Sequence, residues 1–323
     1  METEKGKINC IDLLKLLMAI LVVGIHTEPF GFNMWLDRGF GIITRLCVPF
    51  FFVTSGYFFW IKEKAHINIY LRRLLMLYII WSVVYIPFDV DFLSSATPME
   101  IISRYLWFGN EHALWYLCGS IIGFIITYSL LKIFKPNIVL IIGICFLVMG
   151  CIKSTWEPMF EHLLHVELND ILGSRNGLFY AFPYISLGMA IAKSKNKGKT
   201  KNIKLLVSCL IISLFMLVVE SLLFVMVFHT TSTILWLSVF PCSYFVFLLG
   251  NNIYVKIKKE NSVTLRKIST LVYVSQYLFI PFYKNYVDNI VLFTITTLTT
   301  IIFSIIIINL SNLRKMKFLK HLY

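Results

Sequence analysis

Ionisable residues lie inside an apolar stretch of membrane-spanning length near the start of the chain. Residues 11–30 read IDLLKLLMAILVVGIHTEPF and include Asp12, Lys15 and His26. Such groups are costly in hydrocarbon, so each is a candidate functional residue, although a buried ion pair or a lysine that extends to the interface is the simpler explanation. At about 100° and 1.5 Å per residue, Lys15 and His26 share nearly one helix face, roughly 16 Å apart. With a reference pKa of about 6.5, an imidazole at this place suits a general base.

The residues after His26 predict the end of its helix. They read Thr27-Glu28-Pro29, and a proline disfavours helical geometry in the residue before it. We therefore expect the helix to unwind beside His26 and to open towards water, which favours a functional site over a packed histidine.

A second apolar stretch carries another cation. Residues 45–59 read RLCVPFFFVTSGYFF, with Arg45 one turn before Pro49 and a Ser55-Gly56 pair further on. A proline kinks its helix because the carbonyl four residues back loses its donor, and a Ser-Gly pair permits close helix approach. We expect Arg45 to lie at the depth of His26, so that the two spans line one cavity on the outward side.

The composition excludes an ordinary water-soluble domain. Of 323 residues 58% are hydrophobic and only 15% are charged, and the mean hydropathy is +0.77. The sequence predicts an all-α, polytopic integral membrane protein with about ten transmembrane helices in a single domain over residues 1–323. The expected spans are 11–30, 40–61, 70–90, 113–134, 137–152, 177–193, 203–228, 230–249, 268–287 and 290–310.

The basic residues follow the same alternation. Ten spans place 23 of the 30 Lys and Arg on one side and five on the other, with Lys15 and Arg45 inside spans. This asymmetry predicts a multi-pass membrane protein with cytoplasmic N- and C-termini. We expect it in a cell membrane, namely the cytoplasmic membrane of a bacterium. The net charge of +13 is thereby explained by topology, and no nucleic-acid partner is expected. Seven scattered cysteines without a C-x-x-C pair indicate neither a disulfide framework nor a metal site.

Four motifs together resemble one family. They are Lys15 with His26 eleven residues later, R-x-x-x-P-F-F-F-x-x-S-G-Y from Arg45 to Tyr57, EHALWYL at 111–117, and SRNGLFYAFPYISLG at 174–188. This combination resembles the membrane acyltransferase-3 family, whose ten-helix members move an acyl group, often acetyl from acetyl-CoA, onto hydroxyls of envelope sugars.

Within that family the chain is most similar to the membrane half of vancomycin-resistance serine racemases, through Arg175-Asn176-Gly177 and Glu220-Ser221. That half is linked to serine uptake, so the resemblance also implies an alternative function as a transporter of serine or another small polar solute. The sequence departs from the family at Gln276, where a histidine is expected and where an amide cannot shuttle a proton.

Acyl transfer to a hydroxyl needs a base and a stabiliser of the oxyanion. We assign His26 as the base and prefer Glu220 to Glu28 as the acid that orients it, with a structural ion pair as the alternative for Glu220. The expected donor- or substrate-binding residues are Lys15, Arg45, Ser55, Arg72, Arg73, Trp115, Tyr116 and Arg175. Among these, Arg45 and Arg175 suit planar anions, Lys15, Arg72 and Arg73 suit CoA phosphates, and Trp115 and Tyr116 stack a sugar or belong to the interfacial belt.

The sequence thus predicts an integral membrane O-acyltransferase acting on an envelope or exported glycan, or another hydroxyl acceptor. Its partners are the lipid bilayer and acyl-CoA; it uses acetyl-CoA as co-substrate and binds no resident cofactor. An inactive sensor or scaffold is a further alternative, compatible with Gln276.

Overall fold

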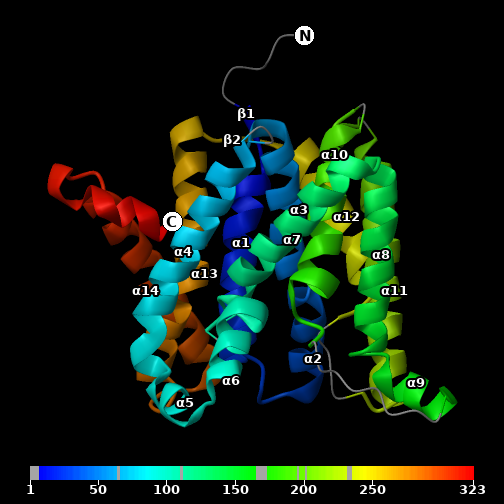
Figure 1. Ribbon diagram of the computed structural model, residues 1–323, viewed down its shortest axis with the longest axis horizontal. Helices are drawn as coiled ribbons and strands as arrows, with labels where there is room; N and C mark the ends of the chain where they lie inside the picture. Colours follow the sequence, from blue (N-terminus) through cyan, green and yellow to red (C-terminus); the bar gives the residue numbers. More distant parts are fainter. Residues whose placement is uncertain are drawn as a thin grey trace. The chain divides into compact units, whose positions relative to one another are not determined.

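The structure, a computed structural model, describes residues 7–63, 66–109, 112–164, 173–194, 196–200, 202–230 and 235–323. Within these ranges the chain forms helices joined by turns and loops, and one antiparallel pair of short strands, β1 (Lys7–Asn9) and β2 (Tyr254–Lys256) (Figure 1). The all-α prediction is confirmed, and the strand pair is an addition to it. Some residues used in the predictions lie outside the described ranges, namely Lys5, Lys64, Glu111, Lys195 and Lys201.

Two compact units, each made of separate stretches of the chain, are present. The first comprises Met1–Cys47, Met76–Val90 and Gly250–Tyr323, and the second comprises Val48–Leu75 and Asp91–Leu249. The single domain over residues 1–323 stays a prediction.

In the first unit α1 packs against α13 and α14, and α13 packs against α14. The N-terminus of α2 is capped by Asn33, whose side chain accepts hydrogen bonds from the backbone N–H groups of Trp35 and Leu36. The helices of this unit are α1 (Ile11–Thr27), α2 (Met34–Thr44), the C-terminal part of α4 (Ile67–Tyr85), the 3₁₀ turn η3 (Ile86–Phe88), α13 (Lys259–Tyr283), α14 (Asn289–Leu310) and the 3₁₀ helix η6 (Arg314–Leu322).

In the second unit α10 is central, because α7, α8, η1 and η5 all pack on it and its side chains are almost all buried. The helices here are α3 (Cys47–Phe58), η1 (Phe59–Glu63), the start of α4, α5 (Val90–Ser95), α6 (Pro98–Ser103), η4 (Arg104–Phe108), α7 (Trp115–Ile133), α8 (Pro136–Ile152), α9 (Glu157–Leu164), η5 (Gly177–Ala181), α10 (Phe182–Lys193), α11 (Ile203–Met226) and α12 (Val239–Asn252). Of these, η1, η4 and η5 are π-helical turns.

Each of the ten predicted spans overlaps a helix. Five described helical stretches are long and apolar enough to cross a membrane: Met34–Ile61, Ile67–Phe88, Trp115–Ile133, Ile203–Met226 and Asn289–Leu310. A sixth candidate is the pair Pro136–Ile152 and Glu157–Leu163, bent by 74°. The chain is therefore a multi-pass membrane protein, whereas the count of ten and the orientation of the termini stay predictions.

Small residues bring α3 and α10 into backbone contact, as the Ser55-Gly56 pair predicts. A Cβ atom added to Gly56 would collide with the backbone carbonyl of Ile185 on α10. A Cβ atom added to Gly188 on α10 would collide with the carbonyl of Val53 on α3. The crossing therefore depends on a glycine in each helix.

Candidate functional site

His26 lies on the last turn of α1, in the first unit. Its Nδ1 is 2.8 Å from the hydroxyl oxygen of Tyr277 on α13, and the two rings tilt at 54° with centroids 4.9 Å apart. The helix ends one residue later at Thr27, and Glu28 adopts left-handed geometry (φ 47°, ψ 57°), which confirms the predicted end before Pro29. The imidazole is half-buried, at a point where a helix end leaves backbone groups open.

Lys15 belongs to a second contact between the same two helices. Its Nζ is 3.8 Å from Oδ1 of Asp12, and Oδ2 of Asp12 accepts a hydrogen bond from the hydroxyl of Ser262 at 2.7 Å. Lys15 is thus an ion-paired, half-buried lysine on the same unbroken helix as His26. Ser262 and Tyr277 carried no signal in the sequence that tied them to α1.

These two contacts fix the direction and register of the helix pair. From Asp12 to His26 is fourteen residues on α1, and from Ser262 to Tyr277 is fifteen on α13. The corresponding rises are about 21 and 22 Å. Because the residue numbers of the paired residues increase in the same direction along both helices, α1 and α13 run parallel. The stripe that carries Lys15 and His26 therefore faces α13 at both ends.

Gln276, which precedes the tyrosine partner of His26, is completely buried. Its Nε2 donates a hydrogen bond to the carbonyl of Tyr273 at 2.9 Å. Its Oε1 has no hydrogen-bond partner among the described residues. Gln276, which departs from the family pattern, is therefore a neutral amide on a buried face of α13.

Arg45 occupies a break in the helical path. α2 ends at Thr44 and α3 begins at Cys47, so the interruption includes the residue whose carbonyl Pro49 leaves without a donor. The helix is thus interrupted at Arg45 and Leu46, and a kink at this point stays a prediction. The side chain of Arg45 is half-buried, and a cavity shared with His26 stays a prediction.

An aromatic cluster in the second unit collects four of the predicted substrate residues. Trp115 stacks on Tyr180 at 14°, with ring centroids 5.5 Å apart, and the guanidinium carbon of Arg175 lies 5.5 Å from the Trp115 ring centroid. The hydroxyl groups of Tyr116 and Ser55 are 3.2 Å apart. These residues come from α3, α7, η5 and the turn before η5, so the fold does assemble this part of the predicted site.

The Arg-Asn-Gly motif has a local structural function. The side-chain oxygen of Asn176 accepts hydrogen bonds from the backbone N–H groups of Leu178 and Phe179 at 2.8 and 2.9 Å, and its Nδ2 donates to the carbonyl of Gly173 at 2.6 Å. Asn176 therefore caps η5 and fixes the turn that presents the exposed Arg175 beside Trp115.

Glu220 of α11 holds the start of α12 in the second unit. Its carboxylate accepts hydrogen bonds from the indole N–H of Trp156 at 3.1 Å and from the backbone N–H groups of Leu237 at 3.0 Å and Ser238 at 2.8 Å. These backbone groups directly precede α12, where N–H donors have no partner within the helix. The predicted cationic or histidine partner is not among these contacts, and the catalytic assignment stays a prediction.

Replacing Glu220 with glutamine should destabilise the protein. The amide exchanges one acceptor oxygen for a donor that faces another donor, so we expect the free energy of unfolding to fall by about 2 kcal/mol. Thermal melting in detergent measures the change, with the exposed Glu260→Gln as the matched loss of charge. A melting temperature equal to that of the wild type would show that these three hydrogen bonds contribute nothing.

Arg72 and Arg73 are exposed on α4, and their binding of CoA phosphates stays a prediction.

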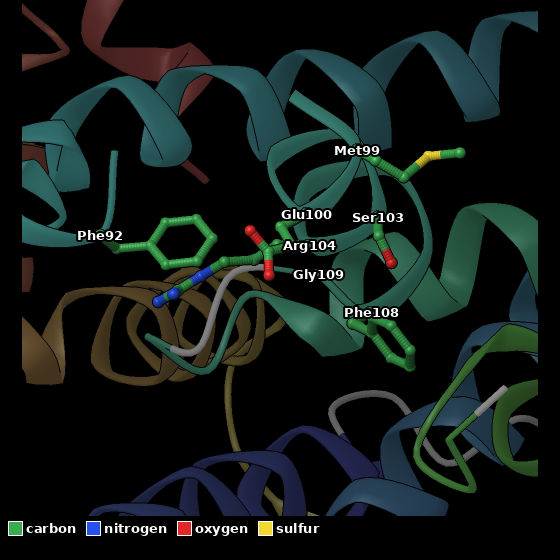
Figure 2. A pocket seen from close by; sticks show the side chains of 7 residues that line it. All are labelled: Phe92, Met99, Glu100, Ser103, Arg104, Phe108 and Gly109. Carbon is green, nitrogen blue, oxygen red and sulfur yellow. The ribbon is translucent and has the colours of Figure 1, made fainter. Parts of the chain in front are cut away.

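A separate cavity of about 430 Å³ lies among α5, α6 and η4 (Figure 2). In it the guanidinium of Arg104 lies 3.9 Å from the ring centroid of Phe92. The backbone N–H and the hydroxyl of Thr97 hold the pKa of Glu100 below its usual value. None of the predicted site residues lines this cavity, whose walls are Phe92, Met99, Glu100, Ser103, Arg104, Phe108 and Gly109.

Comparison with known protein families identifies the family of this chain. Residues 8–309 match the model of the acyltransferase domain Acyl_transf_3. The chain belongs to the acyltransferase-3 family. This match spans both units, and it includes His26, Tyr277 and the aromatic cluster. The resemblance carried by the four sequence motifs is thereby confirmed for nearly the whole chain.

Three curated relatives of this acyltransferase-3 chain are named as racemases. Two are amino-acid racemases of Enterococcus faecalis. The first is 30% identical over 62% of this chain and 30% of the relative, and the second is 26% identical over 90% of this chain and 45% of the relative. The third is a serine/alanine racemase of Enterococcus gallinarum, 27% identical over 65% of this chain and 32% of the relative. The chain thus spans less than half the length of each. No solved structure shows a significant match to it.

Proposed function

We propose that this chain is an integral membrane O-acyltransferase, which transfers an acyl group, acetyl in particular, from a cytoplasmic acyl-CoA to a hydroxyl of an envelope or exported glycan. The observation that carries the proposal is the contact between His26 Nδ1 and the Tyr277 hydroxyl at the end of α1. It is a titratable base held by a second side chain in a membrane protein of an acyltransferase family.

The proposed chemistry uses one tautomer of His26. If Nδ1 carries the proton and donates it to the Tyr277 oxygen, Nε2 is the basic nitrogen. Nε2 takes the proton of the acceptor hydroxyl, and the oxygen of that hydroxyl forms a bond to the thioester carbonyl carbon. The tetrahedral adduct collapses, the carbon–sulfur bond breaks, and the departing thiolate receives the proton from the imidazolium. Tyr277 stabilises the transient positive charge and fixes the ring, as the third member of a triad does.

The distribution of Lys and Arg suggests which end of α1 meets each substrate. Ten spans with both termini in the cytoplasm of a bacterial cell would place Lys15 near the CoA side and His26 near the acceptor side of one helix. The charge on Lys15 then suits a CoA phosphate. Arg45 and Arg175 are proposed binders of the oxyanion or of an acidic acceptor.

The names of the relatives suggest an alternative function. They refer to amino acids, so a transporter of serine or another small polar solute is the alternative outcome of the same test. The two classes differ in ligand, because only a transferase has a reason to bind CoA.

The test is a melting curve of purified protein with acetyl-CoA or with L-serine. A ligand that binds only the folded state stabilises it by about 2.7 kcal/mol at a hundredfold excess over Kd. We expect acetyl-CoA to raise the melting temperature and Lys15→Ala to weaken that rise, with the exposed Lys284→Ala as the matched control. A rise with serine alone would replace the transferase by the transporter.

A further inference from the structure

The 3₁₀ helix η6 directly follows the candidate span α14 and carries a dense cationic surface. Its sequence is RKMKFLKHL, and no acidic residue occurs from residue 312 to residue 323. All of its cationic and titratable side chains are exposed. They are Arg314, Lys315, Lys317, Lys320 and His321.

A 3₁₀ helix repeats every three residues, so side chains three apart share a face. Met316, Leu319 and Leu322 form one such row, and they are half-buried or buried against the first unit. Beyond the bend in the backbone at Met316 (φ −113°, ψ 19°), Lys317 and Lys320 are three residues apart and share the neighbouring face. We call Lys317 and Lys320 the basic row.

Three side-chain contacts hold η6 in place. The indole N–H of Trp81 on α4 donates to the carbonyl of Leu322 at 3.1 Å. The hydroxyl of Tyr323 lies 2.7 Å from that of Ser311, and Nζ of Lys267 lies 5.0 Å from the centroid of the Tyr323 ring. The cations are therefore presented by a fixed element, which begins four residues after the last residue of α14.

Two large apolar side chains lie among these cations and face away from the protein. Leu313 is 54% exposed and Phe318 is 63% exposed. Exposed apolar groups beside lysine and arginine next to a span are typical of a segment at the membrane interface, where apolar groups enter the acyl boundary and cations meet phosphates. A nucleic acid or an acidic protein would satisfy the charges and leave Phe318 in water.

We propose that η6 is a docking surface for anionic phospholipids, in which the basic row binds headgroup phosphates and Phe318 enters the bilayer boundary. The proposal is independent of the transferase assignment, because none of its residues belongs to the candidate site.

The experiment compares melting temperatures in detergent with equal amounts of phosphatidylglycerol or phosphatidylcholine. The test variant is Lys317→Gln/Lys320→Gln, and the control is Arg38→Gln/Lys284→Gln, which removes the same charge from exposed residues elsewhere in the first unit. We expect phosphatidylglycerol to stabilise the wild type and the control alike, and the test variant to lose at least half of that shift. Added salt should weaken the shift, since exposed charges are screened.

Several results would overturn the proposal. The first is a full phosphatidylglycerol shift in the test variant, and the second is an equal loss in the control. A shift reproduced by inorganic phosphate would show a simple anion site, and a stronger shift with a single-stranded oligonucleotide would show a nucleic-acid surface.

Discussion

Substitution of His26 by alanine is expected to lower acetyl transfer by about 10²- to 10⁴-fold, the usual contribution of a positioned general base. The protein should remain folded, because the half-buried ring lies at the end of α1, outside the fully buried core, where it contacts Tyr277. The measurement is the transfer of radiolabelled acetyl from acetyl-CoA to the polysaccharide fraction of membranes that contain each variant. The exposed His162→Ala serves as the control. Wild-type transfer by the alanine variant would exclude His26 as the base.

A companion variant separates positioning from packing. Tyr277→Phe keeps the ring contact with His26 and removes the hydroxyl, so we expect kcat to fall by about tenfold to a hundredfold with little change in KM. If Tyr277 acts through the imidazole, the double variant His26→Ala/Tyr277→Phe should be no slower than His26→Ala alone. Independent, multiplying losses would mean that the hydroxyl acts elsewhere.

The largest expected effect on stability is that of Gly188→Ala at the crossing of α3 and α10. The new methyl group would meet the carbonyl of Val53 and the backbone nitrogen of Tyr57, and neither can move without shifting a helix. Overpacking of this kind costs about 3 kcal/mol. We therefore expect a lower melting temperature and less folded protein in detergent.

Gly119→Ala on α7 is the matched control in the same unit. Its added methyl group would lie 3.7 Å from the nearest atoms, an ordinary contact, and alanine is the better helix former by about 1 kcal/mol. The control should melt at or above the wild-type temperature. Equal melting of Gly188→Ala and Gly119→Ala would contradict the close crossing.

Local features were predictable from short stretches of sequence. The end of α1 beside His26 follows from Pro29, and the break at Arg45 follows from Pro49, because a proline acts on the backbone within a turn. The close approach at Gly56 follows from the absence of a side chain. The motifs also indicated the family, which the match over residues 8–309 confirms.

Side-chain partners were not predictable in this way. The sequence suggested a cation or histidine beside Glu220, whereas the structure gives its carboxylate the Trp156 indole and two backbone N–H groups ahead of α12. A half-buried carboxylate needs hydrogen-bond donors, but the pattern of charged residues in the sequence does not say which ones. The backbone of a loop is a donor that no residue type reveals.

The sequence by itself determined that this is a helical membrane protein with ionisable groups on one stripe of its first long helix. Hydrophobic length, helical period and proline are properties of neighbouring residues, so they can be read without the fold. Only the tertiary structure decided that Tyr277 holds His26 and that Ser262 holds Asp12 beside Lys15. Each of these pairs is about 250 residues apart in sequence, and they meet because α1 and α13 run parallel in a matched register.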